Sequence, residues 1–317
     1  MKNRSDKNYN LVLCGGGALG AFQAGVIKAF SEIGVSIGCV SGASIGALNA
    51  AVVASSSTLK HAANTLESIW MSLAEKSPDA SSAVLQTGLL SKNNIKRIIC
   101  NFCDNSAFDK GISFYVSLYP KESSITRFVE LITTSFTDED TPESDYLLIQ
   151  ELAPEDRIKA IVASACLPWF YGSEKINGKI YTDGGQGRFH SRKGNTPAEP
   201  VIKNNRESTT IVAHLESDSP WNRFDYTDST IIEIRPIPPL SKDFTDIFDF
   251  TKNKILSYMS QGYDNTMKTM TKIADFMNSL NYLDSVFSKQ IEISKELNSS
   301  SLKVENAMQK IKNLKRT

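Results

Sequence analysis

The sequence predicts an α/β protein whose central sheet is mostly parallel. The first observation is the order of strand, helix, strand and helix patterns within residues 9–54. The second is the return of strand-like apolar runs further along the chain, each followed by glycine, proline or polar residues. Composition agrees with a globular fold, since 41% of the 317 residues are hydrophobic and 22% are charged. A chain of this length can bury a sizeable core.

The first four elements follow closely on one another. Residues 9–14, YNLVLC, have the apolar character of a buried strand. Residues 18–34 carry apolar side chains at helical spacing, and Gly34 provides a stop signal. Residues 34–42 then predict a second strand, and residues 44–54 predict a helix of small residues that can pack closely on its neighbours.

The rest of the chain continues with mixed elements. The proline at 154 suits the first turn of a helix, and Pro168 marks the end of that pattern. The acidic stretch 135–145 predicts a solvated surface loop. Helical patterns cover 60–103, 154–168 and the region from 244 onward, and strand patterns cover 111–120, 178–185, 209–215 and 229–237. The tail 285–317 has apolar residues at heptad-like spacing and ends in a basic cluster.

Charge and hydropathy exclude some classes of protein. The 35 Lys and Arg residues balance the 35 Asp and Glu residues, so the total charge gives no indication of nucleic-acid binding. No apolar run reaches the roughly 18 residues of a membrane-spanning helix. Only three apolar residues precede Cys14, whereas a signal peptide needs an apolar core of roughly 7–15 residues. We therefore expect a soluble cytoplasmic protein without a signal peptide, for which local contact with a membrane surface stays open.

The five cysteines favour a reducing compartment, because their number is odd and three of them lie in apolar runs, where free thiols behave as small hydrophobes. Those three are Cys14, Cys39 and Cys166. Cys100 and Cys103 form a lone C-x-x-C, which is weak as a metal site without a second pair or nearby histidines. Their spacing favours helix packing, with both side chains on one face.

Three glycines after the first strand raise the first functional question. Gly15, Gly17 and Gly20 form G-x-G-x-x-G, which in dinucleotide-binding proteins cradles a pyrophosphate at the start of a helix. Such a site also needs an acidic residue about 20 positions later. The only carboxylates before Glu67 are Asp6 and Glu32, and Glu32 lies within the first predicted helix. The loop therefore favours an anion formed during a reaction, for which backbone N–H groups act as an oxyanion hole.

A second glycine motif stands where the acidic residue is missing. Gly42-Ala43-Ser44-Ile45-Gly46 is a G-x-S-x-G between a predicted strand and a predicted helix. In this context the motif indicates a nucleophile elbow, a tight turn that exposes the serine hydroxyl at the positive end of a helix. The alternative is a plain helix start that Ser44 caps. The neighbouring glycine loop favours the nucleophile.

A nucleophilic serine needs a proton acceptor, and the chain offers few histidines for that role. His61 lies in a polar helical stretch, His190 in a basic loop and His214 in a predicted strand. Ser44, Asp183 and then His190 or His214 would have the sequence order of an α/β-hydrolase triad, which is serine, acid and histidine. Asp183 alone is the better candidate, because it ends a strand at an Asp-Gly-Gly turn, where partial burial raises the pKa of a carboxylate. An Asx-turn is the alternative interpretation of this stretch.

Together these blocks resemble the patatin-like phospholipase family. The similarity spans roughly residues 9–265 and also includes Ser164 to Pro168, similar to the family's S-x-x-x-P, and Asn195 to Pro197, similar to its N-x-P. The matching glycine, serine and aspartate blocks are Gly15-Gly16-Gly17-Ala18-Leu19-Gly20, Gly42-Ala43-Ser44-Ile45-Gly46 and Asp183-Gly184-Gly185.

The resemblance implies a three-layer α/β/α sandwich that hydrolyses lipid acyl esters without calcium or another cofactor. It implies Ser44 as nucleophile, Asp183 as general base and the backbone of Gly15, Gly16 and Gly17 as oxyanion hole. The substrate partner would be membrane or micellar phospholipid, and the oligomeric state is left open. We expect a catalytic domain over residues 1–280 and a helical basic tail over 281–317.

Some features depart from the family pattern or lie outside it. Many members carry Arg or Lys where Leu19 stands, which puts in doubt a headgroup-binding charge at that position. The segment after Asp183 is basic and could meet phosphate headgroups or form a solvated loop; its basic residues are Arg188, His190, Arg192 and Lys193. The apolar residues of 244–280 predict core packing, with a lid or a membrane-facing surface as the alternative. The basic end, Lys310 to Arg316, could help docking on anionic lipid.

Four functions compete on this evidence. The leading one is hydrolysis of ester-linked fatty acids from phospholipids or lysophospholipids through an acyl-enzyme. A soluble carboxylesterase or thioesterase could use the same Ser–Asp pair. A regulated effector that damages membranes would use the same phospholipid hydrolysis as the leading function. The presence of both Ser44 and Asp183 argues against a binding module that has lost its activity. The lack of an acidic residue about 20 positions after the glycine loop argues against a dinucleotide-dependent enzyme.

Overall fold

The computed structural model describes residues 8–77, 91–121, 140–165, 173–206 and 208–314. Its internal contacts divide the chain into two compact units, Met1–Met267 and Lys268–Thr317. The first unit holds the sheet and the described helices up to the first turns of the last helix. The second unit is the remainder of that helix. A domain boundary at residue 280 stays a prediction.

A mixed sheet of eight described strands forms the centre of the first unit, as the sequence predicts. Its strands run in the order β5-β6-β3-β2-β1-β7-β8, and β4 pairs with β3. The pairs joining β3, β2, β1, β7 and β8 are parallel, whereas β4, β5 and β6 pair antiparallel. The strands are β1 (Asn8–Leu13), β2 (Ser36–Gly42), β3 (Ser113–Pro120), β4 (Asp145–Leu148), β5 (Glu174–Ile176), β6 (Lys179–Asp183), β7 (Thr210–Ala213) and β8 (Ile231–Ile234).

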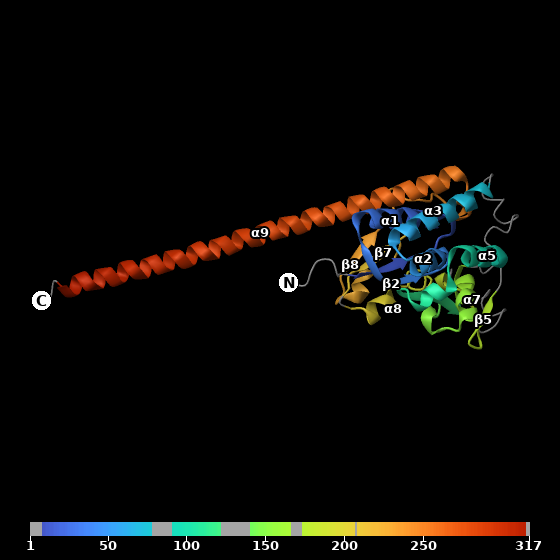
Figure 1. The fold of residues 1–317 in the computed structure, drawn as a ribbon, viewed down its shortest axis with the longest axis horizontal. Coiled ribbons are helices and arrows are strands. Elements are labelled where there is room, and N and C mark those ends of the chain that lie inside the picture. Colours follow the sequence, from blue (N-terminus) through green and yellow to red (C-terminus); the bar gives the residue numbers. More distant parts are fainter. Residues whose placement is uncertain (1–7, 78–90, 122–139, 166–172, 207, 315–317) are drawn as a thin grey trace. The chain divides into compact units, whose positions relative to one another are not determined.

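Helices cover both faces of this sheet. Figure 1 shows α1 and α3 on one side of the strands and α8 on the other. This arrangement is the expected α/β/α layering. The described helices are α1 (Ala21–Ile33), α2 (Ile45–Ser55), α3 (Leu59–Glu75), α5 (Lys92–Phe102), α7 (Pro154–Ala165), α8 (Ala198–Asn204) and α9 (Lys252–Leu314), and short 3-10 turns include η2 (Gly17–Gly20), η5 (Gly184–Gln186) and η7 (Phe244–Phe248).

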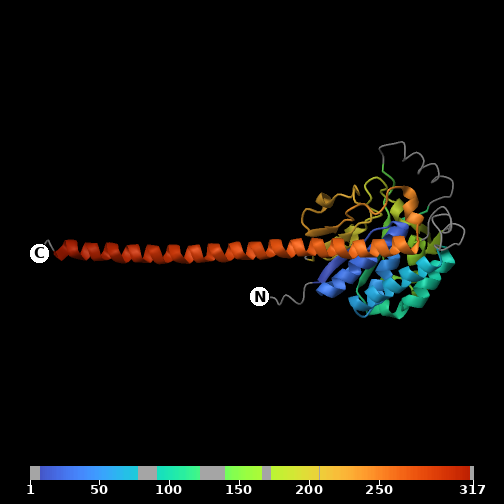
Figure 2. The same cartoon turned by 90° about the horizontal axis from the view of Figure 1, so that it is seen from above.

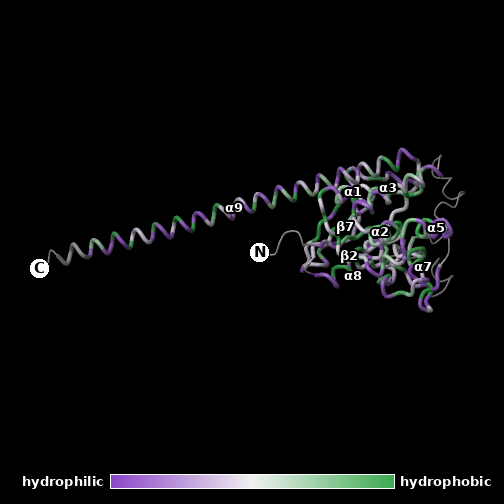
Figure 3. Tube along the Cα trace, in the orientation of Figure 1, coloured by the Kyte–Doolittle hydropathy of each residue, from purple (hydrophilic) through white to green (hydrophobic). Residues whose placement is uncertain are grey.

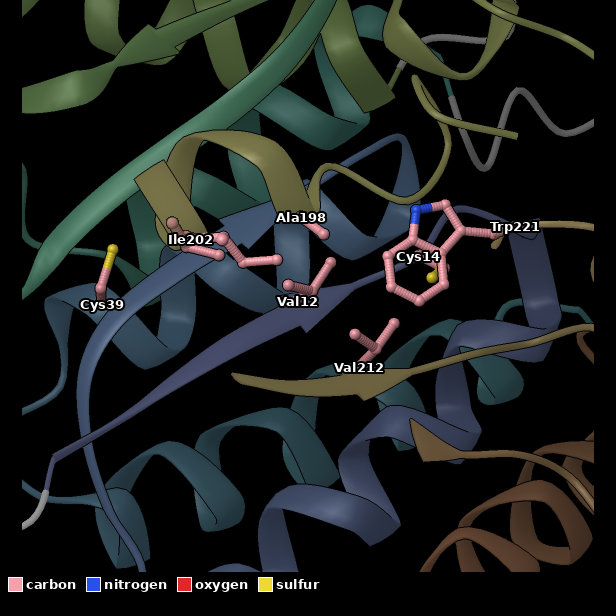
Figure 4. Close-up of a cluster of buried hydrophobic side chains, with 8 residues drawn as sticks. Val12, Cys14, Cys39, Ala198, Ile202, Val212 and Trp221 are labelled. Carbon is pink, nitrogen blue, oxygen red and sulfur yellow. The ribbon is translucent and has the colours of Figure 1, made fainter. Parts of the chain in front are cut away.

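Alternating side chains of the strands build a core on each face. Val12 of β1, Cys14 directly after it and Val212 of β7 pack against Ala198 and Ile202 of α8 (Figure 4). Leu11 and Leu13 point to the opposite face and are fully buried. Burial raises the pKa of the Cys14 thiol to about 12, although its contact with Thr196 acts in the other direction. This cysteine is therefore a neutral core residue at working pH.

The register of the parallel strands brings two loops to the same edge of the sheet. Leu13 of β1 lies opposite Gly42 of β2 and opposite Ala213 of β7. The carboxyl ends of β1 and β2 are therefore level. In open α/β sheets this edge is where ligands bind. The glycine loop after β1 and the turn at Ser44 after β2 leave the sheet side by side.

Several element boundaries differ from the sequence prediction. The predicted helix over 60–103 is two helices, α3 and α5, and the residues between 77 and 91 lie outside the described part. Strands β4 and β5 and helix α8 are not predicted, because each is only three to seven residues long. The acidic loop 135–145 is described only from 140, and the helix predicted to end at Pro168 is described to Ala165.

The C-x-x-C pair does not share one environment. Helix α5 ends at Phe102, so Cys103 is the residue that caps the helix and turns inward. Cys103 is buried, whereas Cys100 is exposed. The prediction that both side chains lie on one packed helix face is therefore wrong for Cys100. Cys166 lies outside the described residues.

The first turns of α9 belong to the core of the first unit. Ile255 and Tyr258 are buried, which agrees with core packing for this part of 244–280. Helix α9 crosses α1 at very short range (Figure 2), because a Cβ atom at Gly262 would lie 1.9 Å from the carbonyl oxygen of Phe22. A Cβ atom at Gly25 of α1 would lie equally close to the carbonyl oxygen of Met259. Only glycine allows this approach of two helix backbones.

We expect Gly262→Ala to lower the free energy of unfolding by about 1–3 kcal/mol, because the added methyl group forces the two helices apart. The helix propensity of alanine acts in the opposite direction by about 1 kcal/mol. Urea unfolding followed by tryptophan fluorescence measures the change. Ser260→Ala, at an exposed position of the same helix, is the matched control. Equal stability of the Gly262→Ala variant and the wild type would contradict the close crossing.

Within the described residues, none of the helices combines the length and the apolar character needed to cross a bilayer. Helix α9 has the length but carries charged residues throughout.

Candidate active site

Ser44 occupies a strained turn between β2 and α2. Its φ of 52° and ψ of −129° place it in a region that non-glycine residues rarely adopt. The flanking glycines make the turn sterically feasible. A Cβ atom at Gly42 would lie 2.4 Å from the carbonyl oxygen of Gly46, and one at Gly46 would lie 2.2 Å from that of Leu13. This geometry is typical of a nucleophile elbow.

Asp183 reaches Ser44 from the opposite side of β3. It is the last residue of β6 and lies opposite Leu118 in the antiparallel pair. Its Oδ2 accepts a hydrogen bond of 2.7 Å from Ser44 Oγ, and its Oδ1 accepts one of 2.8 Å from Gly185 N–H. The two residues are 139 positions apart in the sequence. A serine hydroxyl in direct contact with a carboxylate can pass its proton to that carboxylate.

The carboxylate of Asp183 is nearly sealed from solvent. Only 7% of the residue is exposed, and 9% of Ser44. Burial raises the pKa of Asp183 to about 6, although the hydrogen bonds from Gly185 and Ser44 act to lower it. A carboxylate with this pKa is a better proton acceptor near neutral pH than an exposed aspartate.

The glycine loop after β1 presents backbone N–H groups beside this pair. A Cβ atom at Gly15 would lie 2.8 Å from Ser44 Cβ, so the loop and the serine are in contact. Gly15 N–H already donates to the carbonyl oxygen of Asn195 at 3.4 Å. Within the described part of the chain, the N–H groups of Gly16 and Gly17 have no acceptor. Of the three predicted oxyanion donors, these two are therefore the available ones.

Asn195 connects the glycine loop with the aspartate turn. Its Nδ2 donates to the carbonyl oxygen of Gly15 at 3.3 Å, and its backbone oxygen accepts from Gly15 N–H. Its Oδ1 lies close to Gly185, since a Cβ atom there would be 3.0 Å away. The N-x-P segment that the sequence resemblance includes thus holds two loops that approach Ser44 from different strands.

Ser164 fixes the backbone of the nucleophile turn. Its Oγ accepts a hydrogen bond of 3.0 Å from Ser44 N–H and donates one of 2.8 Å to the carbonyl oxygen of Ser117. Both hydrogen bonds are buried. The S-x-x-x-P pattern drew attention to this residue, but the sequence alone gives it no partner.

A buried polar network anchors both ends of the glycine loop. Gln23 Nε2 donates to the carbonyl oxygen of Cys14 at 2.8 Å, at the start of the loop. Asn49 Nδ2 donates to the carbonyl oxygen of Gly20 at 3.0 Å, at its end, and also to Gln23 Oε1 at 2.9 Å. Trp70 Nε1 donates to Asn49 Oδ1. Sequence reasoning misses this network, because in sequence these residues look like ordinary members of helix faces.

The three histidines have partners other than Ser44. His214 is buried and its Nε2 lies 3.0 Å from Glu233 Oε2. Burial lowers the pKa of His214, and Glu233 partly offsets this. His61 belongs to the first turn of α3, where its N–H donates to Thr58 Oγ1. His190 donates its backbone N–H to Asp140 in the loop after β6.

The basic segment after Asp183 is held by carboxylates. Arg188 pairs with Glu143 at 2.9 Å. Arg192 pairs with Glu216 at 3.2 Å, and Lys193 pairs with Asp225 at 2.8 Å. These pairs favour a structural role for the segment over free binding of phosphate groups.

Two further sequence features have a clear place. Leu19 is buried in the core, so the position at which related proteins often carry a charge faces the interior here. In the ranges that the structure describes, no group of three or more His, Cys, Asp or Glu residues is arranged to hold a metal ion.

A match to one protein family spans all of these motifs. A family model described as patatin-like phospholipase matches residues 11–202. A lysophospholipase nte1 from Aspergillus terreus is 52% identical over 48 residues, which are 15% of this chain and 3% of that protein. Among solved structures, VipD from Legionella pneumophila has a TM-score of 0.44 and 13% identity over 86% of this chain and 69% of that one. The type III effector protein ExoU has a TM-score of 0.41 and 15% identity over 84% of this chain and 53% of its own.

Proposed function

Because the chain belongs to the patatin-like phospholipase family, whose model matches more than half of its length, we propose that it releases ester-linked fatty acids from phospholipids or lysophospholipids through a Ser–Asp pair. The observation that carries the proposal is the 2.7 Å hydrogen bond from Ser44 Oγ to buried Asp183, at a turn with the backbone strain of a nucleophile elbow. The family supports lipid ester hydrolysis, and the roles of the individual residues are our proposal.

The proposed reaction has two steps. Ser44 Oγ attacks the ester carbonyl carbon while its proton passes to Asp183 Oδ2. The carbonyl oxygen becomes an oxyanion, and in this proposal the N–H groups of Gly16 and Gly17 donate hydrogen bonds to it. Collapse of this intermediate expels the alcohol, which takes the proton from Asp183, and leaves the acyl chain on Ser44. Water then attacks the acyl-enzyme while Asp183 accepts one of its protons. The bond between the acyl carbon and Ser44 Oγ breaks, Ser44 Oγ takes the proton back from Asp183, and the fatty acid leaves.

Fatty acid release from mixed phospholipid vesicles tests the proposal. We expect wild-type protein to release free fatty acid, and we expect a fluorophosphonate probe to label Ser44, as judged by peptide mass spectrometry. A rate that rises above the critical micelle concentration of a short-chain phospholipid indicates an enzyme that acts on lipid surfaces. A rate that does not change at the critical micelle concentration indicates a soluble esterase instead. Absence of both hydrolysis and labelling would refute the proposal.

Asn195→Ala should lower kcat by about 10- to 100-fold, because the glycine loop and the aspartate turn lose the side chain that joins them, and displacement of catalytic groups by about 1 Å has an effect of this size. We expect a smaller change in KM, since Asn195 positions other groups. Steady-state kinetics on a soluble ester measures both constants. Asn204→Ala, at an exposed position of α8, is the matched control. An equal loss in both variants would contradict the positioning role.

A further inference from the structure

The second unit of the chain is a helix with a long row of exposed apolar side chains. Figure 3 shows hydrophobic residues returning at intervals along α9. Phe276, Phe287 and Leu297 are each more than 60% exposed. Side chains of this size and number rarely stay in contact with water on a folded protein. Their spacing indicates what covers them.

These side chains follow a seven-residue repeat from residue 273 to residue 308. Taking Ile273 as position a, the a and d positions together form one seam, which we call the α9 seam. Its eleven positions include three polar residues, Gln290, Ser294 and Ser301. The eight apolar residues of the seam are Ile273, Phe276, Leu280, Leu283, Phe287, Leu297, Val304 and Met308.

We propose that the α9 seam forms a parallel, in-register coiled coil with the same segment of a second copy of this chain. Side chains that recur every 3.5 residues turn gradually around a straight helix, because such a helix has 3.6 residues per turn. Over five heptads they therefore do not stay on the one side of the helix that a flat surface could contact. A partner helix that supercoils with α9 can follow them. The repeat therefore specifies a helix as the partner.

The charges of this segment disfavour a lipid surface as the partner. Residues 268–309, which carry the seam, contain five lysines and five acidic residues, and the basic cluster Lys310 to Arg316 comes only after the last seam position. An amphipathic helix that lies on an anionic membrane instead carries an excess of Lys or Arg on its polar face. The balanced charge suits a coiled coil, whose outer positions are mixed and polar.

The polar seam positions select the parallel arrangement. In an in-register parallel pair, Gln290, Ser294 and Ser301 each face their own counterpart, and so does every apolar seam residue. In an antiparallel pair, a positions face d positions. Every antiparallel register with substantial overlap then sets at least one of these polar side chains against an apolar one, for example Ser294 against Leu297. Polar residues at seam positions are known to fix register in this way.

The available area is sufficient for a stable interface. A fully buried aliphatic side chain removes roughly 60–120 Å² from water. The eight apolar residues therefore remove roughly 500–1,000 Å² per copy, which compares with about 800 Å² per partner in a standard interface. Four flanking residues at e and g positions widen the apolar stripe: Met277, Val286, Ile291 and Ile293.

The mass of the full chain in solution tests the proposal. Light scattering coupled to size-exclusion chromatography should give at least twice the chain mass of 34.9 kDa for the wild type. The double variant Leu283→Glu, Phe287→Glu should be monomeric, while Tyr282→Glu, at outer position c, should stay associated. The tryptophans lie outside the coil, so their fluorescence confirms that the first unit stays folded. A monomeric wild type, including one that instead binds anionic vesicles, would overturn the proposal, as would equal dissociation by Tyr282→Glu.

Crosslinking tests the parallel register. Ser294→Cys places a thiol at a seam position, where parallel copies bring the two sulfur atoms into disulfide range. Ser299→Cys, at outer position f, is the matched control. Under mild oxidation we expect covalent dimers for Ser294→Cys well above the background of the wild type and of Ser299→Cys. Equal yields from the two variants would overturn the in-register arrangement.

Discussion

Replacing Ser44 by alanine is expected to lower kcat for phospholipid or ester hydrolysis by roughly 10⁴- to 10⁶-fold. The variant loses the atom that forms the acyl-enzyme, while the glycine loop and the buried site around it remain. The residual rate should come from water attacking a substrate that is still bound and oriented. Release of fatty acid, normalised to folded protein, measures the loss. Ser55→Ala, at the other end of α2, is the matched control, because its hydroxyl donates to the carbonyl oxygen of Ala51 in its own helix.

Asp183→Asn should reduce kcat by roughly 10⁴-fold, since the amide keeps the shape of the side chain but cannot take the serine proton. The double variant with Ser44→Ala should be no slower than Ser44→Ala alone, because the two residues act as one unit. Asp228→Asn, on the surface, is the matched control. An Asp183→Asn variant that keeps most of its rate would move the general base elsewhere, with His214 and His190 as the next residues to replace.

The sequence predicts the parallel part of the sheet well, because its strands are rich in apolar residues and the first two, β1 and β2, end at or close to glycines. It also places Ser44 and the glycine loop together, since neighbouring parallel strands share a carboxyl edge. Asp183 is different: its strand is antiparallel and its approach to Ser44 depends on the pairing with β3. The Asp-Gly-Gly turn makes this residue a candidate base in the sequence and the family resemblance supports it, but its position beside the serine becomes visible only in the structure.

The supporting contacts could not be predicted for a related physical reason. Gln23 and Asn49 are polar residues within apolar helices. Each donates a hydrogen bond to a backbone carbonyl group at one end of the glycine loop that follows β1. Ser164 depends in the same way on Ser44 and Ser117, which lie on β2 and β3 and their turns. A single sequence carries no signal for hydrogen bonds between segments so far apart. The strain at Ser44 likewise becomes visible only as a backbone angle.

The rate of hydrolysis should rise with pH through about 6 and then level off. Asp183 accepts the serine proton only when it is ionised, and its pKa of about 6 sets the midpoint of the rise. The profile of kcat/KM against pH on a neutral ester, measured between pH 4 and 9, reports this value for the free enzyme. An exposed aspartate would instead give a midpoint near 4. A midpoint near 4 would therefore contradict the burial of the carboxylate.

The same shift makes Asp183 a source of instability at the pH where the enzyme works. Well below pH 3.8 the carboxyl group is protonated in both the folded and the unfolded chain, so it has no effect on the free energy of unfolding. Between pH 4 and 6 the unfolded chain ionises while the folded chain keeps its proton, so stability falls as pH rises. A shift from 3.8 to about 6 corresponds to a loss of about 3 kcal/mol, fully developed above pH 6.

Asp183→Asn should therefore stabilise the protein at pH 8 by up to about 3 kcal/mol, and this gain should disappear at pH 4. Urea unfolding of both proteins at the two pH values, followed by tryptophan fluorescence, measures the difference. Asp228→Asn controls for the loss of a negative charge, because its carboxylate is exposed and should give the same small change at both pH values. A gain for Asp183→Asn that is independent of pH would come from packing rather than from ionisation. A gain confined to high pH would show that the folded chain keeps a destabilising buried carboxylate beside Ser44, as expected for a group retained for its chemistry rather than for stability.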